Sequence, residues 1–182
     1  MSARLRVLSS QTIYTGKVVQ LKLDQVIEPG GVSAQREVVY HPGSVVVLPC
    51  LADGGVALVR QYRYPTRRWL WELVAGGMEP GETPRESACR ELYEETGYRA
   101  RSLKLLCDFY SSPGFLTERM FLVEARGLTR SKARPDADEC IQVGHFTRAQ
   151  LFKMIRGNQI HDGKTLVGIL WLLSKSRKSK AK

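Results

Sequence analysis

Three glutamates within one short segment could together hold a metal ion. Glu91, Glu94 and Glu95 lie in residues 76–98, whose sequence is GGMEPGETPRESACRELYEETGY. If residues 84–96 are helical, each side chain is turned by about 100° from the last, so the carboxylates share an arc of about 100°. Like charges at these spacings destabilise a bare helix. A hard divalent cation, most readily Mg²⁺, would relieve the repulsion; a solvent-facing, glutamate-rich helix is the alternative.

The same segment contains start and stop signals for that helix. Thr83 suits the N-cap, Pro84 suits the first helical position, and Glu86 completes a Thr-x-x-Glu capping box. Gly97 suits the left-handed position that ends a helix. The sequence therefore predicts a helix over residues 84–96.

The remaining residues of the segment are expected to hold a loop against this helix. Ala88 and Leu92 lie beside the carboxylates on the helical wheel and should face the core. Arg90 falls on the opposite side of the wheel from the carboxylates, and we expect it to form an ion pair with Glu82 that pins the loop to the helix. Three glycines should let the loop bend and approach a ligand closely: Gly76, Gly77 and Gly81.

The complete spacing of the segment resembles the signature of the Nudix hydrolases. Gly76 is followed after five residues by Glu82, after seven more by residues 90–92 (REL), and then by residues 94–95 (EE) and Gly97. The resemblance implies hydrolysis of a pyrophosphate bond by metals that contact its oxygens and activate a water. It also implies Mg²⁺ as the cofactor, with Mn²⁺ as a possible substitute.

Other stretches resemble the ADP-ribose pyrophosphatase branch of these hydrolases, which cleaves nucleoside diphosphate sugars. They are residues 59–65 (VRQYRYP), 71–76 (WELVAG) and 112–115 (SPGF). In that branch a proline is expected sixteen residues after the last glycine of the motif, and Pro113 stands sixteen residues after Gly97. The resemblance covers about residues 16–173. It implies a nucleoside monophosphate and a sugar phosphate as products.

The resemblance implies roles residue by residue. The backbone carbonyl of Ala75 and the carboxylates of Glu91 and Glu95 correspond to the magnesium ligands, and Glu94 corresponds to an assisting carboxylate. The residues expected near the substrate are Arg63, Glu72, Pro113 and Glu118. For Arg63, a solvated arginine at the end of a strand is nearly as good an interpretation of the sequence alone.

The general base is expected in the loop before the last strand. In the resembled branch, a glutamate of this loop approaches the metals and the attacking water. The loop here is residues 134–139, in which Glu139 is the best match and Asp136 and Asp138 are alternatives. Acidic residues that simply stay solvated are the competing interpretation. The expected catalytic residues are thus Glu139, Glu94, Arg90 and Glu82.

One position departs from the resembled branch. In that branch an aromatic residue that helps to hold the nucleobase of the substrate often stands near the position of Val19. Valine cannot stack on an adenine ring. Tyr14 could substitute for it, so the preference for adenine stays open. Members of the branch are usually homodimers in which the N-terminal strands complete the partner's site, and we expect a homodimer here.

The pattern around the motif predicts an α+β domain with the Nudix fold. Strands are expected at 17–27, 36–40, 44–51, 56–62, 103–110, 120–125 and 141–147, and two further helices at 148–155 and 164–173. Strands in runs, without steady βαβ alternation, predict a mixed β-sheet sandwiched between helices (α/β/α). Residues 1–174 are expected to form one Nudix hydrolase domain, with an N-terminal antiparallel β segment at about residues 1–42.

Composition places the chain among ordinary globular proteins. It has 182 residues, of which 43% are hydrophobic and 25% are charged. The longest strongly apolar stretch, residues 166–173, is far too short to span a bilayer, and the N-terminus lacks the apolar core of a secretory signal. The four cysteines have no short CxxC spacing and are expected to be ordinary thiols. We therefore expect a cytoplasmic protein with no membrane partner.

The charge balance leaves two other function classes open. Of the net charge of +10, five charges lie in residues 175–182, a basic tail expected to be disordered and to attract nucleic acid only weakly. The alternatives are a Nudix hydrolase acting on a dinucleotide cofactor or an RNA 5′ end, and a non-catalytic Nudix module that binds a ligand or RNA. Such modules usually lose at least one metal-binding glutamate. Since Glu91, Glu94 and Glu95 are all present, an enzyme is favoured.

Overall fold

The computed structural model describes residues 4–130 and 141–175. Their contacts divide them into two compact units. Unit 1 comprises the chain up to Gly43 together with Tyr110–Arg119, and unit 2 comprises Ser44–Phe109 together with the chain from Met120 onward.

Ten strands and three α-helices are described. The strands are β1 (Arg6–Thr15), β2 (Gln20–Ile27), β3 (Ser33–Tyr40), β4 (Ser44–Pro49), β5 (Val56–Arg63), β6 (Arg68–Glu72), β7 (Val74–Gly77), β8 (Tyr98–Tyr110), β9 (Arg119–Arg130) and β10 (Gln142–Phe146). The helices are α1 (Pro84–Thr96), α2 (Arg148–Arg156) and α3 (Gly163–Lys175), and a 3₁₀ turn, η1 (Tyr64–Thr66), follows β5. The sequence predicts all three helices but not β1, β6 or β7.

Unit 1 is built on an antiparallel sheet in the order β1-β2-β3. This sheet is the antiparallel segment predicted for the N-terminal part of the chain. The connection between β8 and β9 also belongs to the unit, because Val39 of β3 exchanges backbone hydrogen bonds with Phe115 and Thr117, at 2.8 and 2.9 Å. Every residue of β1 is exposed, so this strand contributes little to the core of unit 1.

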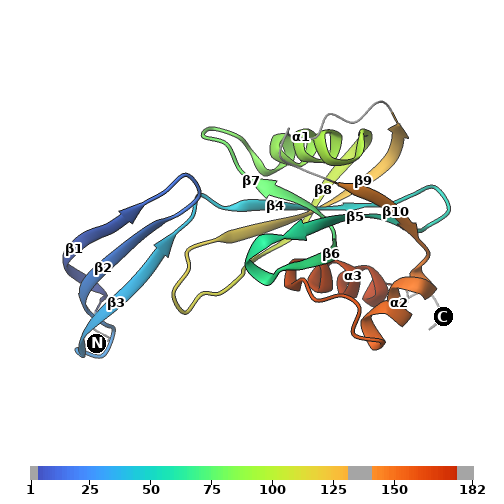
Figure 1. Cartoon of the computed structure of the whole chain (residues 1–182). Helices are drawn as coiled ribbons and strands as arrows, with labels where there is room; N and C mark the ends of the chain where they lie inside the picture. The colour runs from blue at the N-terminus through green and yellow to red at the C-terminus, as the bar shows by residue number, and fades with distance from the viewer. Residues whose placement is uncertain (1–3, 131–140, 176–182) are drawn as a thin grey trace. The chain divides into compact units, whose positions relative to one another are not determined.

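Unit 2 contains the mixed sheet and all three helices. One sheet has the order β7-β4-β9-β8, in which β4 runs antiparallel to β7 and parallel to β9, and the other has the order β10-β5-β6. Helix α1 covers one face of these strands, whereas α2 and α3 cover the opposite face (Figure 1). The predicted α/β/α arrangement is therefore confirmed.

Strand β4 forms the centre of the hydrophobic core. Val45 and Val47 pack in one cluster with Ala88 and Leu92 of α1. The alternate residues of the strand pack in a second cluster on the side of α2 and α3, whose buried members include Val46, Leu48, Leu151 and Ile169. A strand covered on both faces has no polar side, which is why its sequence is a continuous apolar run.

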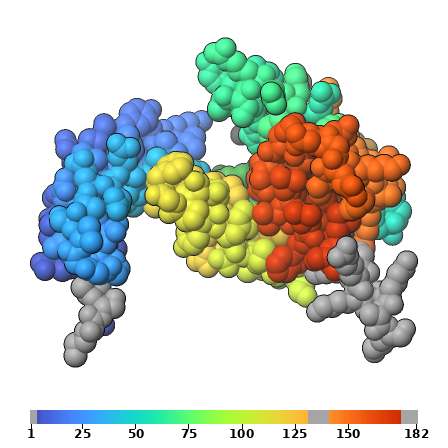
Figure 2. Space-filling model, turned by 90° about the horizontal axis from the view of Figure 1, so that it is seen from below, coloured from blue at the N-terminus to red at the C-terminus, as the bar shows by residue number. Residues whose placement is uncertain are grey.

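Helices α2 and α3 form the surface opposite α1, shown in orange and red in Figure 2. Helix α2 begins at a capping box in which Thr147 and Gln150 exchange hydrogen bonds. Helix α3 extends through Lys175, so the first residue of the predicted tail is helical and the rest of the tail lies outside the described residues. Within the described ranges, no helix has both the length and the apolar character needed to cross a membrane.

Candidate functional site

Helix α1 begins and ends as its sequence predicts. The Thr83 side chain accepts a hydrogen bond from the Glu86 backbone N–H at 3.3 Å, and the Glu86 carboxylate accepts one from the Thr83 backbone N–H at 2.8 Å. Gly97 ends the helix with φ of 72°, in the left-handed region. These caps fix the helix that presents the candidate carboxylates.

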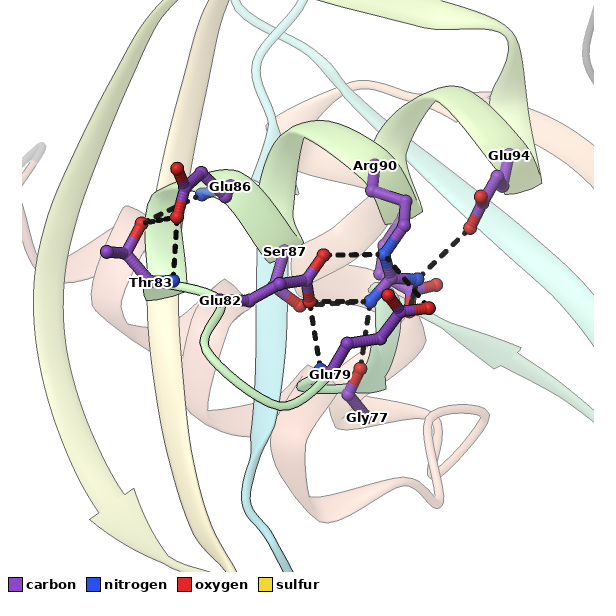
Figure 3. Close-up of polar contacts among 9 residues, drawn as sticks. Gly77, Glu79, Glu82, Thr83, Glu86, Ser87, Arg90 and Glu94 are labelled. Atoms are coloured by element: carbon purple, nitrogen blue, oxygen red, sulfur yellow. Dashed lines mark hydrogen bonds and ion pairs between the residues drawn. The ribbon is translucent and has the colours of Figure 1, made fainter.

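Arg90 pins the loop before α1 to the helix. Its Nε and Nη2 donate to the two oxygens of Glu82, each at 2.9 Å, and Nη2 also donates to the Gly77 carbonyl at 3.0 Å (Figure 3). The predicted ion pair is confirmed.

The prediction that Arg90 lies opposite the carboxylates is wrong. Its Nη1 lies 2.6 Å from Glu91 Oε1 and 3.2 Å from Glu94 Oε2. Glu94 follows Arg90 by four residues and Glu91 by one, so at 100° per residue the two carboxylates leave the helix only about 40° and about 100° from Arg90, on the same side of the wheel. Arg90 therefore joins the loop glutamate to the helix glutamates in one charged network.

This network shifts the pKa values of its members. The hydrogen bond from Arg90 is the main cause that lowers the pKa of Glu82 to about 2, and a hydrogen bond from the backbone of Glu79 adds to it. The hydrogen bonds that Arg90 donates to Glu82, and then those to Glu91, raise the pKa of Arg90. Glu82 and Arg90 therefore keep their charges at neutral pH.

The carboxylates of α1 are packed against strand β7. Glu91 and Glu95 are only 9% and 4% exposed. A Cβ added to Gly76 of β7 would fall on the carboxylate of Glu91, so only glycine leaves room for it. These carboxylates, with the backbone carbonyls of β7, offer the hard oxygen donors that Mg²⁺ prefers, so the residues present fit that ion. Side chains alone would not complete such a site, because among residues 4–130 and 141–175 no group of three His, Cys, Asp or Glu side chains could hold a metal ion.

A second ionic cluster surrounds Glu72, at the end of β6. Its Oε1 accepts from Arg63 Nε and its Oε2 from Arg63 Nη2, both at 2.8 Å, while Lys164 Nζ lies 2.5 Å from Oε2. Burial alone would raise the pKa of Glu72, but the hydrogen bonds from Arg63 and the charge of Lys164 outweigh it, and the pKa is lowered. The hydrogen bond to Glu72 raises the pKa of Arg63, and the charge of Glu95 adds to this rise. Arg63 is thus within electrostatic reach of α1.

The first turn of α3 completes this cluster with residues that sequence reasoning missed. Asp162 Oδ1 accepts from Lys164 Nζ at 2.9 Å, and Asp162 Oδ2 accepts from the Thr165 backbone N–H at 2.9 Å. The Thr165 hydroxyl accepts from the Leu73 backbone N–H at 2.8 Å. An aspartate three residues before a threonine, at the start of an apolar run, is a helix N-cap signal that could have pointed to Asp162.

Other predicted site residues are not part of unit 2. Pro113 and Glu118 belong to unit 1, where Glu118 accepts a hydrogen bond from the Ser111 hydroxyl at 2.7 Å and lies 3.9 Å from His41 Nδ1. Unit 2 contains the other predicted site residues that the structure describes, which are Arg63, Glu72, Ala75, Glu82, Arg90, Glu91, Glu94 and Glu95. The candidate bases Asp136, Asp138 and Glu139 lie outside the described residues.

Comparisons with known proteins identify the family of the chain. Residues 40–165 match the model of the NUDIX domain. The chain is 37% identical to an ADP-ribose pyrophosphatase of Bacillus subtilis (strain 168) and 36% identical to a methanol dehydrogenase activator of Bacillus methanolicus; each match covers 92% of this chain and 91% of the relative. The crystal structure of an ADP compounds hydrolase has the same fold, with a TM-score of 0.84 at 20% identity over 100% of this chain and 98% of that chain.

The resemblance seen in the sequence is therefore confirmed over most of the chain. Both the matched domain and the identity to the Bacillus subtilis pyrophosphatase extend well beyond the segment that contains α1. This chain belongs to the Nudix family and is a Nudix pyrophosphatase.

Proposed function

We propose that the chain hydrolyses the pyrophosphate bond of ADP-ribose or a related nucleoside diphosphate sugar in a Mg²⁺-dependent reaction. The products are a nucleoside monophosphate and a sugar phosphate. The observation that carries the proposal is the packing of the nearly buried carboxylate of Glu91 against Gly76 of β7, on the helix that also holds the nearly buried Glu95. The 37% identity to an ADP-ribose pyrophosphatase supports this substrate class.

In this proposal the metal ligands are the backbone carbonyl of Ala75 and the carboxylates of Glu91 and Glu95, with Glu94 assisting. When bound, Mg²⁺ (or Mn²⁺) supplies positive charge to the diphosphate oxygens and lowers the pKa of a bound water. The protein's own residues hold the proposed ligands in place. Arg90 and Glu82 hold the loop and the helix together, and Arg90 Nη1 keeps Glu91 oriented.

Arg63 is proposed to meet the phosphates of the substrate. It is a cation whose charge is within reach of Glu95, and its side chain is 37% exposed. Glu72 is proposed to support Arg63, since both oxygens of its carboxylate accept hydrogen bonds from cations of the chain. Pro113 and Glu118 stay proposals that rest on the resemblance to the ADP-ribose branch.

The proposed general base is Glu139, with Asp136 and Asp138 as the alternatives. Glu139→Gln should be measured beside Asp136→Asn and Asp138→Asn at saturating Mg²⁺. A base used chiefly in the transition state should cost about 10²–10⁴-fold in kcat with little change in KM. A larger loss in either aspartate variant would move the role to that residue. If none of the three matters, the loop supplies no base.

We also propose that the active form is a homodimer in which the N-terminal strands take part. Leu8, Ile13 and Tyr14 of β1 are each more than half exposed, and apolar side chains gathered on one exposed strand are typical of a contact surface. Sedimentation of the full chain should give twice the monomer mass. A double variant, Leu8→Lys with Ile13→Lys, should shift the equilibrium toward the monomer. Sedimentation of the unaltered chain as a monomer at micromolar concentration would contradict the proposal.

The substrate proposal is tested by a panel of pyrophosphates. ADP-ribose, ADP-glucose, GDP-mannose, NADH and capped RNA should be assayed for monophosphate release with Mg²⁺, with Mn²⁺ and with a chelator. We expect ADP-ribose or another sugar nucleotide to give the highest kcat/KM, and the chelator to abolish it. Preference for NADH or capped RNA would favour the other enzyme classes. Binding without hydrolysis of any compound would favour a ligand-binding module.

Three broader predictions from the sequence stay predictions. They are that residues 1–174 act as one Nudix domain, that the basic tail has no catalytic role, and that the protein is cytoplasmic. Deletion of residues 174–182 should leave turnover of small substrates unchanged, and a large loss of kcat in a folded protein would overturn the second prediction. Fractionation of cells that produce the full chain tests the third.

A further inference from the structure

A nearly buried carboxylate links the first turn of α3 to Arg63. Glu72 is 1% exposed and lies between two cations, Arg63 and Lys164, which together donate three hydrogen bonds to it. Lys164 is itself only 11% exposed and also donates to Asp162. The four charged side chains therefore form one continuous ionic chain, in the order Arg63, Glu72, Lys164 and Asp162.

This ionic chain is not needed to attach α3 to the sheet. The Thr165 hydroxyl already accepts from the Leu73 backbone N–H, and Ile169 and Leu172 of the helix are buried in the core. Buried ion pairs contribute little net stability, because removing the charges from water costs about as much as their attraction returns. A role in the reaction explains better why the charges are placed here.

Arg63 is the most exposed of these four charged residues. Two of its nitrogens, Nε and Nη2, donate to Glu72, which fixes the plane of the guanidinium. Its side chain is nevertheless more than a third exposed, and its charge interacts with that of Glu95. Glu72 therefore fixes the orientation of a guanidinium that stays partly exposed.

We propose that Lys164 and Asp162 are positioning residues for substrate binding, which act on Arg63 through Glu72. The inference rests on the proposed function, because it takes the diphosphate of a nucleoside diphosphate sugar as the anion that Arg63 meets. Asp162 orients Lys164, Lys164 balances part of the charge of Glu72, and Glu72 thereby holds Arg63 in one orientation. No bond is made or broken by this chain of charges.

The direction of the effect follows from the charges. Without Lys164, Glu72 has Arg63 as its remaining partner in the cluster and draws it closer. The cluster also loses one positive charge, while the carboxylates of α1 keep their negative charges. Both changes weaken the attraction for a diphosphate. Since Lys164 acts before the chemical step, its loss should raise KM and leave kcat almost unchanged.

The test compares Lys164→Met with Lys153→Met, a matched change at an exposed lysine of α2. The dissociation constant of a non-hydrolysable α,β-methylene analogue of ADP-ribose is measured by calorimetry, beside KM and kcat for ADP-ribose and the melting temperature. We expect Lys164→Met to raise the dissociation constant and KM about tenfold with kcat within about threefold. Lys153→Met should stay within about twofold. Asp162→Asn, whose amide oxygen can still accept from Thr165, should act in the same direction as Lys164→Met but less strongly.

A double-mutant cycle separates positioning from a general structural role. In an Arg63→Gln background, Lys164→Met should change the dissociation constant by less than about twofold, because its target is gone. An equal rise in both backgrounds, or no rise in either, would overturn the inference. If Lys164→Met does not fold, the cycle is run with Asp162→Asn. If the unaltered chain neither binds the analogue nor hydrolyses any sugar nucleotide, the proposed function fails instead.

Discussion

The carboxylate of Glu91 lies where a side chain on Gly76 would begin. Gly76 belongs to β7 and Glu91 to α1, so strand and helix meet at this contact. A β-carbon on Gly76 could be placed only if the Glu91 carboxylate shifted. Of the candidate metal ligands, Glu91 forms this contact and Ala75 is one residue from it. The geometry of the site thus depends on the absence of a single methyl group.

Gly76→Ala should therefore damage both the fold and the site. We expect a loss of about 1–3 kcal/mol in the free energy of unfolding, as is typical of overpacking, and a loss of at least about tenfold in kcat, since Glu91 or β7 must shift. Denaturant titration and steady-state kinetics measure the two effects. Gly77→Ala is the matched control for stability, because a Cβ there meets no described atom within 4 Å. Near-normal behaviour of Gly76→Ala would contradict the described contact.

Glu95→Gln should keep the fold and remove most of the activity. The change deletes one charge without changing the volume of a side chain that is almost fully buried. Loss of a ligand should cost more than the roughly 10–100-fold typical of residues that merely support a ligand, and should weaken the apparent affinity for Mg²⁺. Steady-state rates across a Mg²⁺ titration check both effects. If the purified variant turns over at close to the normal rate, Glu95 is not a ligand.

Glu82→Gln should reveal a pH-dependent contribution to stability. The pKa of Glu82 falls from an ordinary value of 4.5 to about 2 in the folded chain. A lowered folded pKa means that the charged form stabilises the fold above pH 4.5, and that this contribution is lost as the pH falls toward 2. Urea titrations at pH 7, 4 and 3 should therefore show the variant less stable at pH 7 and the difference shrinking on acidification. A difference that stays constant would show that the charge of Glu82 is not responsible.

Thr165→Val should destabilise the fold without the change in KM expected for Lys164→Met. The substitution removes the acceptor of the buried Leu73 N–H, and an unsatisfied buried donor costs about 1–3 kcal/mol. Thr165→Ser keeps the hydroxyl and should recover most of this loss. Thermal melts and steady-state kinetics of both variants provide the comparison. A rise in KM with unchanged stability would mean that Thr165 acts on the substrate site instead.

The parts of the fold that the sequence predicts well are those specified by neighbouring residues. Helix α1 is bounded by Thr83, Glu86 and Gly97, which lie within or beside the helix that they cap. The pair formed by Glu82 and Arg90 is predicted for the same reason, since both belong to one motif. The central strand β4 is recognisable because burial on both faces demands an unbroken apolar run.

What the sequence does not predict depends on distant contacts. Strand β1 is exposed along its whole length and so shows no hydrophobic alternation. Strands β6 and β7 are short and follow one another with no turn signal between them. Glu72 meets Lys164 across 92 residues of sequence, a pairing that only the packing of α3 against the sheet creates. The contacts of Arg90 with Glu91 and Glu94 are not of this kind, since helical spacing alone brings residues four apart together.

The position of β4 between two hydrophobic clusters has a consequence for how the chain folds. Its parallel pairing with β9 joins Ser44 to Met120, so a long loop must close before this pairing can form. Contacts between residues so far apart in the sequence slow folding. Neither cluster can be completed earlier, because both include side chains of this one strand, Val46 and Leu48 in one and Val45 and Val47 in the other. Unit 2 should therefore form and lose its two cores together. Removal of a buried methyl group from the cluster on the side of α3 should therefore also weaken the packing that holds α1 and its carboxylates in place.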